Sequence, residues 1–403
     1  MRALVAVEKG SFLEEALDVG SLQPKDRGLA WFIANGVLRH RRSIDSSLRP
    51  LLRAPLGGLD AEVRATLRAG TFERLYGRAA AHAVVHEAVE TARAVGAGRA
   101  SGLVNAVLRK VALPPDLGRG ERLEHPDWLI ERWTTRYGAE ATDSWCSSNN
   151  LPPPLTLAGP RLVEIRGDLE GLGYGVSPAH AASAELPDAL TVKGHRGPIE
   201  ALPGFAEGAF WVQDPAAIAV ADLLDVEPGS TVLDACAAPG GKTFRLASRG
   251  ADVLAVDRSE GRLSLVSASL ERLKLAASTR LHDWAQGPLE GAPRFDFVLV
   301  DAPCSALGTL RRRPEIRWRR HPEDLEGAAQ RQRAILEATL PHLREGGTLV
   351  YAVCSPEPEE AEAHVAALAE RAPDLELVRR WSSSPPAHGE DAHQALIWRR
   401  RGS

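Results

Sequence analysis

The stretch TVLDACAAPGGKTF, residues 231–244, decides the fold class of this 403-residue chain. It opens with an apolar run, Thr231–Leu233, that is typical of a buried strand, and a helical pattern begins at Phe244. The small residues and glycines between them let the backbone come close to a ligand. Because ligands bind at the carboxyl ends of strands in open α/β sheets, this loop is a candidate ligand site.

The alternation of strand and helix continues on both sides of this loop, from about residue 205 to the end of the chain. Further strand-like apolar runs lie at Val253–Val256, Phe297–Val300 and Thr348–Val353, with helical patterns between them, and Thr279–His282 is a further expected strand. This alternation predicts an α/β fold, a doubly wound and mostly parallel sheet with helices on both faces.

Two other regions precede the predicted sheet. The pattern from Met1 to Arg122 is helical and predicts an all-α bundle of roughly six or seven helices, with Leu113–Arg122 as a linker. A helical stretch from Trp128 to Trp145, followed by short apolar pieces, predicts a small α/β subdomain. We therefore expect three domains, over residues 1–122, 123–204 and 205–403.

The composition argues against several classes of protein. Four cysteines without a C-x-x-C pair do not make a disulfide scaffold or a zinc site, so we expect no metal. The first residues lack the apolar core of a signal peptide, and no run of about 18 apolar residues suits a membrane span. We expect a cytoplasmic, monomeric protein with free thiols and no membrane partner.

The formal net charge of −4 is unevenly spread, because residues 1–125 carry +5 and the remainder −9. Binding of RNA would therefore depend on the N-terminal part and on local basic patches. One such patch is a run of arginines around Trp318, at positions 311, 312, 313, 317, 319 and 320. Arginines beside an aromatic ring suit RNA phosphates and base stacking, whereas the plain alternative is a solvated loop or helix face.

Four interpretations of the loop after Leu233 compete. Gly241-Lys242-Thr243 looks like the end of a Walker A loop, but that motif needs a glycine where Cys236 stands. The dinucleotide pattern G-x-G-x-x-G is absent. A methyltransferase loop, which cradles an amino acid and a sulfonium, fits better than either, and the fourth possibility is a strand-to-helix turn without a ligand.

Two acidic residues at later strand ends support the methyltransferase interpretation. Asp257 ends the strand after the loop, where a carboxylate can accept hydrogen bonds from two ribose hydroxyls. Asp283 follows the third predicted strand and is placed to face an adenine edge. An aspartate at a strand end is also a common turn former, so both interpretations of Asp283 stay open.

Two cysteines also follow predicted strands. Phe297–Val300 runs into Asp301-Ala-Pro-Cys304-Ser, and Thr348–Val353 runs into Cys354-Ser-Pro. Both thiols are therefore expected at the edge that carries the cofactor loop, although a lone cysteine is more often a buried structural residue.

Thiols at this edge suit a specific chemistry. Addition of a thiolate to C6 of cytosine makes C5 nucleophilic toward an electrophilic methyl group. A carboxylic acid near N3, a role open to Asp301, can stabilise the adduct, and a base must then remove the C5 proton.

These motifs resemble those of the RNA 5-methylcytosine methyltransferases of the Nop2/Sun/Fmu family. The matching stretches of the catalytic half are residues 234–243, 301–305, 311–318 and 351–355. The N-terminal region is similar to the NusB-like RNA-binding domain of the bacterial members that act on 16S rRNA. Its telling stretches are Asp26-Arg27, Gly36-Val-Leu-Arg39 and Val104-Asn-Ala-Val-Leu-Arg109.

The resemblance implies a Rossmann-like class I methyltransferase domain that uses S-adenosylmethionine to methylate C5 of a cytidine in 16S rRNA. It implies that Cys354 is the nucleophile, that Cys304 helps to release the product, and that Asp301 faces both cofactor and base. DNA cytosine methyltransferases use the Pro-Cys cysteine instead, which would make Cys304 the attacker. The implied cofactor-binding residues are Cys236, Ala237, Ala238, Pro239, Gly240, Gly241, Lys242, Asp257, Asp283 and Asp301.

The chain departs from the family pattern at two places. Ser305-Ala306-Leu307-Gly308 stands where the family has Ser-Gly-Thr-Gly, which puts the flexibility of that loop in question. His388-Gly-Glu-Asp-Ala392-His393 stands where the family has Asp-Gly-Phe-Phe, which puts one wall of the substrate pocket in question. Two rival functions remain, the same chemistry on tRNA or DNA and an RNA-binding protein without activity.

Overall fold

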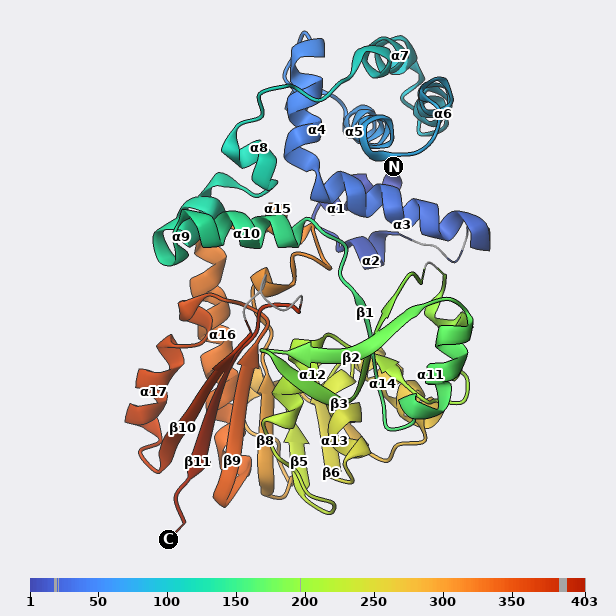
Figure 1. Cartoon of the computed structure of the whole chain (residues 1–403). Helices are drawn as coiled ribbons and strands as arrows, with labels where there is room; N and C mark the ends of the chain where they lie inside the picture. The colour runs from blue at the N-terminus through green and yellow to red at the C-terminus, as the bar shows by residue number, and fades with distance from the viewer. Residues whose placement is uncertain (18–19, 21, 196, 384–389, 403) are drawn as a thin grey trace. The chain divides into compact units, whose positions relative to one another are not determined.

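The computed structural model describes residues 1–17, 20, 22–195, 197–383 and 390–402 (Figure 1). The chain forms two compact units. The first consists of Met1–Pro152 and Leu310–Arg320, and the second of Pro153–Thr309 and His321–Ser403. Over this described part of the chain, none of the helices combines the length and the apolar character that a membrane span requires.

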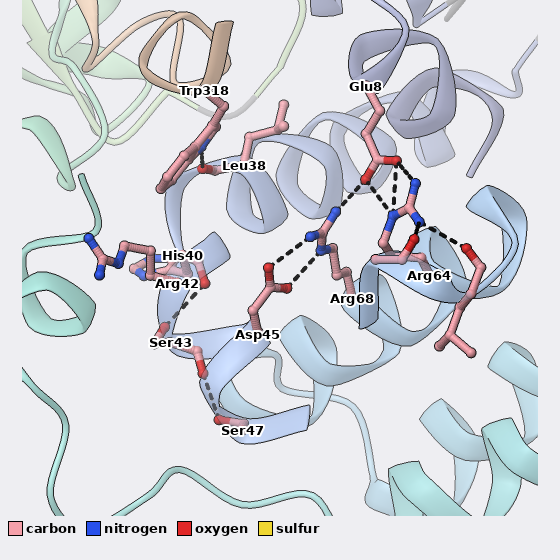
Figure 2. A network of polar contacts seen from close by, with 12 residues as sticks. Glu8, Leu38, His40, Arg42, Ser43, Asp45, Ser47, Arg64, Arg68 and Trp318 are labelled. Atoms are coloured by element: carbon pink, nitrogen blue, oxygen red, sulfur yellow. Dashed lines mark hydrogen bonds and ion pairs between the residues drawn. The ribbon is translucent and has the colours of Figure 1, made fainter. Parts of the chain in front are cut away.

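The first unit is helical, as predicted. Between Arg2 and Lys110 its α-helices are α1 (Arg2–Glu8), α2 (Leu13–Ala16), α3 (Pro24–Arg39), α4 (Arg41–Leu48), α5 (Ala61–Tyr76), α6 (Ala81–Ala94) and α7 (Ser101–Lys110). Their common core includes Val37, Leu67 and Leu108, which are almost fully buried. A network of ion pairs joins α1, α4 and α5, because Arg68 contacts both Glu8 and Asp45 (Figure 2).

Between Val111 and Pro152 the chain adds three more α-helices to this unit, α8 (Arg119–Leu123), α9 (Asp127–Tyr137) and α10 (Ala139–Asn149). The single helical stretch expected from Trp128 to Trp145 is thus two helices, which separate at Gly138 with a φ of 82°. The rings of Trp133 and Trp145 stack across them with centroids 4.1 Å apart.

Residues 310–320 belong to the helical unit although they lie within the sequence of the catalytic half. Their short helix α15 (Ile316–Arg319) buries Arg317 completely. The Arg317 guanidinium donates to the carbonyl oxygens of Glu124, Asn149 and Leu310 and to Asn150 Oδ1. The Trp318 indole donates to the Leu38 carbonyl at 2.7 Å (Figure 2). These two side chains of the predicted RNA-binding patch are therefore engaged in protein contacts.

The second unit contains the predicted doubly wound sheet. Its seven strands lie in the order β10-β11-β9-β8-β5-β6-β7. Strands β5 to β9 pair in parallel, whereas β11 is antiparallel to both β9 and β10. The strands are β5 (Thr231–Asp234), β6 (Asp252–Asp257), β7 (Ser278–Leu281), β8 (Phe295–Asp301), β9 (Leu343–Val353), β10 (Leu375–Ser382) and β11 (Gln394–Arg400).

Helices cover both faces of this sheet (Figure 1). Helices α16 (Glu323–Thr339) and α17 (Ala363–Arg371) pack on the face that carries Leu233, Val300 and Tyr351. The opposite face, with Val232, Leu299 and Val350, packs against α12 (Pro215–Asp222) and α13 (Gly241–Ser248). Helix α14 (Glu260–Leu273) contacts β6 and β7. Alternate residues of each strand therefore enter separate cores, as a doubly wound sheet requires.

A smaller antiparallel sheet precedes the large one and corresponds to the expected α/β subdomain. Its strands are β1 (Leu155–Ala158), β2 (Gly175–Ala181), β3 (Ala184–Lys193) and β4 (Trp211–Val212), in the order β2-β3-β1-β4. Helix α11 (Leu162–Gly171) packs on β2 and β3. The three domains expected from the sequence stay a prediction. In the division into compact units, α9, α10 and residues 310–320 belong to the same unit as the N-terminal helices.

Because Arg317 is buried and hydrogen-bonded, its replacement would test how strongly residues 310–320 stabilise the helical unit. Arg317→Met would leave its buried carbonyl acceptors without a donor. We expect this to lower the local free energy of unfolding by about 3 kcal/mol. Hydrogen exchange of the α10 amides would measure the change. Arg313→Met is the control, because Arg313 forms an exposed ion pair with Glu14 and should cost less than about 1 kcal/mol. Equal protection in both variants would contradict the stabilising role of Arg317.

Candidate active site

Four neighbouring strands bring the predicted site residues to one edge of the large sheet. Asp234, Asp257 and Asp301 are the last residues of β5, β6 and β8, and Cys354 follows β9 directly. Because these strands are parallel and adjacent, their carboxyl ends lie together. The edge predicted from the sequence is therefore formed.

The loop between β5 and α13 is held by its backbone. The Ala237 amide donates to the Val256 carbonyl at 2.9 Å, and the Ala238 amide donates to the Asp257 carboxylate at 3.2 Å. The peptide bond before Pro239 is cis. Gly240 has a φ of +108°, and a Cβ there would lie 2.4 Å from the Phe244 ring. Only glycine fits at this position, which keeps the start of α13 close to the strand end.

Asp234 is a fully buried acid at the base of this loop. Its Oδ2 accepts a hydrogen bond from Thr243 Oγ1 at 2.7 Å, whereas Oδ1 has no partner among the described residues. Burial raises the pKa of Asp234 to about 7, against the Thr243 hydrogen bond, which lowers it. An unpaired buried carboxylate oxygen favours a donor from a ligand at this place.

Lys242 and Asp301 form an ion pair next to it, with Nζ 2.5 Å from Oδ2. Lys242 is 8% exposed, and burial alone would lower its pKa. The Asp301 carboxylate and, more weakly, Cys354 and Asp234 outweigh burial, so the pKa of Lys242 is raised. The ammonium group therefore stays charged beside the thiols.

The two motif cysteines lie in contact, with Cys304 Sγ 3.3 Å from Cys354 Sγ. Both side chains are half-buried. The hydrogen bond to Cys354, followed by burial, raises the pKa of the Cys304 thiol well above its usual range. The Cys304 thiol therefore favours its protonated form.

One departure from the family pattern, Ala306 in place of glycine, has a conformational cost in the loop after Cys304. Ala306 has a φ of +61°, a left-handed conformation that glycine adopts more easily by about 1 kcal/mol. Gly308 is tightly enclosed, since a Cβ there would lie 1.9 Å from the Ala392 carbonyl oxygen. Its amide donates to the Cys354 carbonyl, and its own carbonyl accepts from the Ala392 amide, both at 3.0 Å. The backbone thus joins the two cysteine segments to the segment before β11.

A cavity of about 510 Å³ opens at this edge. Of the predicted site residues, those that line it are Cys236, Ala237, Pro239, Gly241, Lys242 and Asp301. Asp234, the first residue of the loop motif but not one of the predicted site residues, lines it as well. Trp211, Gln213 and Asp214 also line it and were missed by the sequence analysis. The signal for Asp214 was present, because Asp-Pro at the start of a helix is a capping pattern, and its side chain accepts from the Ala216 amide.

Four predicted cofactor residues are not among those that line this cavity, namely Ala238, Gly240, Asp257 and Asp283. The Asp257 carboxylate accepts hydrogen bonds from the backbone amides of Ala238 and Ser259. Asp283 caps the turn that follows β7 by accepting from the Ala285 amide. Their contacts with the ribose and the adenine stay predictions.

The remaining cysteines have environments that suppress thiolate formation. Burial, and then the nearby acids Asp234 and Asp301, raise the pKa of Cys236 well above its usual range. Cys146 lies in the helical unit, where burial raises its pKa to about 12. A thiolate nucleophile is therefore expected from the motif pair and not from these two residues.

Comparison with known proteins places this geometry in a family. A family model described as 16S rRNA methyltransferase RsmB/F matches residues 221–399. The NusB family matches residues 1–113, and the ferredoxin-like domain of RsmF/B-like methyltransferases matches residues 125–158. The ribosomal RNA small subunit methyltransferase B of Serratia proteamaculans (strain 568) is 35% identical, over 98% of this chain and 95% of its own length. The chain belongs to the RsmB/F methyltransferase family.

Further relatives agree with this assignment. The ribosomal RNA small subunit methyltransferase B of Escherichia coli O7:K1 (strain IAI39 / ExPEC) is 36% identical, over 94% of this chain and 91% of its own. The crystal structure of PH0851 has a similar fold, with a TM-score of 0.85 at 23% identity, and the match covers 98% of this chain and 96% of that one. The protein is thus an S-adenosylmethionine-dependent RNA methyltransferase.

The residues of this methyltransferase fit its cofactor. Asp234 Oδ1 is buried and accepts no hydrogen bond from the described residues. The amino group of S-adenosylmethionine could donate one to it. Gly241 lines the cavity without a side chain, and a Cβ there would lie 3.0 Å from Gln213. The predicted loop residues would therefore hold the amino acid part of the cofactor.

The second departure from the family pattern lies partly within the described residues. His388 and Gly389 fall outside them, whereas Ala392 and His393 are buried directly before β11. Burial, and then the positive charge of Lys242, lower the pKa of His393 to about 4. The buried His393 imidazole is therefore neutral near neutral pH.

The raised pKa of Asp234 makes a prediction about stability. Between pH 3.8 and about 7 the folded protein holds a proton on Asp234 that the unfolded chain releases. Stability from this group is therefore lost as the pH rises through that window. The Asp234→Asn variant has no carboxyl group to ionise at this position, so it does not lose this stability. The Tm of the variant minus the Tm of the parent enzyme should therefore be larger at pH 8 than at pH 5.5. The expected change in free energy is on the order of 2 kcal/mol.

Calorimetry without cofactor would measure the Tm of each variant. Asp296→Asn is the matched control, because hydrogen bonds from Thr231 hold the pKa of Asp296 below 3.8. Its Tm difference from the parent enzyme should be the same at both pH values. A pH-independent difference for Asp234→Asn as well would contradict the raised pKa.

Proposed function

We propose that this methyltransferase transfers a methyl group to C5 of a cytidine in 16S rRNA through a covalent bond between Cys354 Sγ and C6. The observation that carries the proposal is the contact between the Cys304 and Cys354 thiols at 3.3 Å, on the edge that carries the cofactor loop. Two thiols in contact can act in turn on one base. The names of the relatives support ribosomal RNA as the substrate and, with it, a cytoplasmic enzyme.

The two thiols would have different roles because their environments differ. Cys354 attacks C6 as a thiolate, and Lys242 places a positive charge on the same edge. The raised pKa of Cys304 suits a group that carries a proton and acts later. After methylation Cys304 would first lose its own proton to solvent and then, as a strongly basic thiolate, take the proton from C5. The electrons of the C5–H bond form the C5=C6 double bond, the C6–S bond breaks, and Cys354 leaves as a thiolate.

Asp301 would serve the base while it also borders the cofactor cavity. Its carboxylate is paired with Lys242 and lines the cavity of about 510 Å³. To stabilise the negative charge that develops at N3 of the attacked cytosine, Asp301 would act in its acid form and donate a proton to N3, with the Lys242 ammonium as the nearby cation. S-adenosylmethionine supplies the electrophilic methyl group. The target cytidine must be unstacked, because C5 and C6 have to be reached from the ring faces.

Trapping of the protein–RNA adduct would test the proposed roles of the cysteines. Cys304→Ala should accumulate an adduct with unmodified 16S rRNA, because release is impaired. Cys354→Ala should form no adduct, and methyl transfer should fall by about 10³-fold or more because the nucleophile is lost. The measurement is a denaturing gel after incubation with radiolabelled S-adenosylmethionine.

The opposite pattern, with an adduct only in Cys354→Ala, would reverse the two roles. Parallel assays on tRNA and duplex DNA would test the substrate class, and stronger labelling of either would contradict 16S rRNA. Absence of label on all three would favour an RNA-binding protein without this activity.

We also propose that the helical unit binds RNA. A groove of about 710 Å³ runs along one face of α6 and α7. Its basic lining residues are Arg74, His82, His86, Arg93 and Arg109. None of the described residues that line it is acidic, although Arg93 forms an exposed ion pair with the nearby Glu90. A groove with this charge favours a phosphate backbone as its ligand.

Removal of two arginines from this groove would test the proposal. Arg93 and Arg109 are exposed, so Arg93→Ala combined with Arg109→Ala should leave the fold intact. We expect the slope of log affinity against log salt to fall by about 1 per lost phosphate contact. Binding titrations with 16S rRNA at several salt concentrations would measure it. Arg49→Ala with Arg53→Ala removes two exposed arginines outside the groove, and an equal effect there would contradict a local site.

A further inference from the structure

A buried carboxylate lies beneath the two cysteine segments and has no place in the chemistry described so far. Glu360 ends the short 3₁₀-helix η8 (Pro358–Glu360) and is fully buried. Its Oε1 accepts from the Ser305 amide at 2.7 Å and from Gln332 Nε2 at 3.0 Å. Its Oε2 accepts from the hydroxyls of Ser305 and Ser355, each at 2.5 Å. One carboxylate thus receives four hydrogen bonds.

These hydrogen bonds reach both cysteine segments at once. Ser305 follows Cys304, and Ser355 follows Cys354, so each serine is the chain neighbour of one motif thiol. The two serine hydroxyl oxygens are themselves 3.1 Å apart. A single side chain therefore sets the distance between the segments from which both thiols project.

Glu360 is in turn held by several elements of the fold. Tyr351 of β9 donates its hydroxyl proton to the Glu360 carbonyl at 2.6 Å. Gln332 of α16 also donates to the Pro303 carbonyl at 3.1 Å, and its Oε1 lies 3.2 Å from His364 Nε2 on α17. The position of the carboxylate is thus fixed relative to α16, α17 and the sheet.

A stability role alone does not account for this arrangement. The side-chain groups that donate to Glu360 in the described structure are two hydroxyls and an amide, all neutral. Burial of an acid without a cation is costly, and an apolar residue of similar size often stabilises such a site more. What the carboxylate adds is direction, because its Oε2 accepts from one hydroxyl of each cysteine segment while its Oε1 fixes the Ser305 amide.

We propose that Glu360 is a positioning residue that holds the Cys304 and Cys354 thiols in contact without touching the substrate. The use of that contact in methylation rests on the proposed function, whereas the contact itself can be measured without RNA or cofactor. Loss of the carboxylate should let the two segments separate, and an amide in its place should keep most of the geometry.

Ellman's reagent, an aromatic disulfide, reports the contact directly. The thiolate of one cysteine attacks the reagent, which breaks its S–S bond, forms a mixed disulfide and releases one thionitrobenzoate. The second thiolate then attacks the mixed disulfide, forms the Cys304–Cys354 bond and releases a second thionitrobenzoate. Two electrons pass from the thiols to the reagent, and the two thiol protons go to the buffer. The rate of the second release measures how close the thiols lie.

We expect this second release to be at least about 10-fold slower in Glu360→Ala than in the parent enzyme. Glu360→Gln should restore it to within about 3-fold, because the serine hydroxyls can turn to accept from the amide. Glu362→Ala is the matched control, since Glu362 is exposed and paired with Arg380. Peptide mapping of the disulfide would confirm which cysteines have joined, and Cys304→Ala should stop after one release.

An unchanged second release in a folded Glu360→Ala variant would overturn the proposal. If that variant does not fold, Ser305→Ala and Ser355→Ala each remove one hydroxyl donor and carry the same test. A slower second release in both supports the role of Glu360, and unchanged rates in both overturn it. A slow second release in an enzyme that forms no RNA adduct would contradict the proposed function and leave this inference standing.

Discussion

The parallel pairing of β9, β8, β5 and β6 is the constraint on which the active site depends. The register places Val300 beside Tyr351 and Asp234 beside both Leu299 and Ala255. The four strands therefore end at similar heights, and the residues that follow them meet. Because alternate residues of a strand face opposite sides, a slip of one residue would turn these side chains toward the other core. The two hydrophobic cores thus hold the chemistry in register.

Local environment then separates residues of the same type. Cys304 and Cys354 carry identical groups, but burial and the contact between them keep the proton on Cys304. In the loop that carries Cys304, Ala306 has a left-handed backbone conformation. This conformation costs alanine about 1 kcal/mol more than it would cost glycine. That cost is tolerated because Gly308 is hydrogen-bonded to both Cys354 and Ala392. Strain in the loop is thus offset by the contacts that fix its end.

Much of this arrangement could be predicted from the sequence, because strand alternation and loop motifs are local signals. The strands at 231–233, 253–256, 279–282, 297–300 and 348–353 lie within or next to observed strands, and both thiols are at the expected edge. The roles of Arg317 and Trp318 could not be read, since their acceptors are mostly backbone carbonyls that leave no pattern in the sequence. The bridge made by Glu360 was hidden for a similar reason, because it joins residues 55 and 28 positions apart.

Two of the buried carboxylates in the second unit, those of Glu360 and Asp234, differ in how many hydrogen bonds they accept, and this difference separates their tasks. Glu360 receives four hydrogen bonds from the protein and does not line the cavity. Asp234 lines the cavity, accepts one side-chain hydrogen bond, and has a pKa raised by burial. A buried acid that is fully paired gains nothing from a ligand, so it can only hold structure. A buried acid left with a free oxygen gains a hydrogen bond when a donor enters, so part of its burial cost can become affinity for a ligand that brings such a donor.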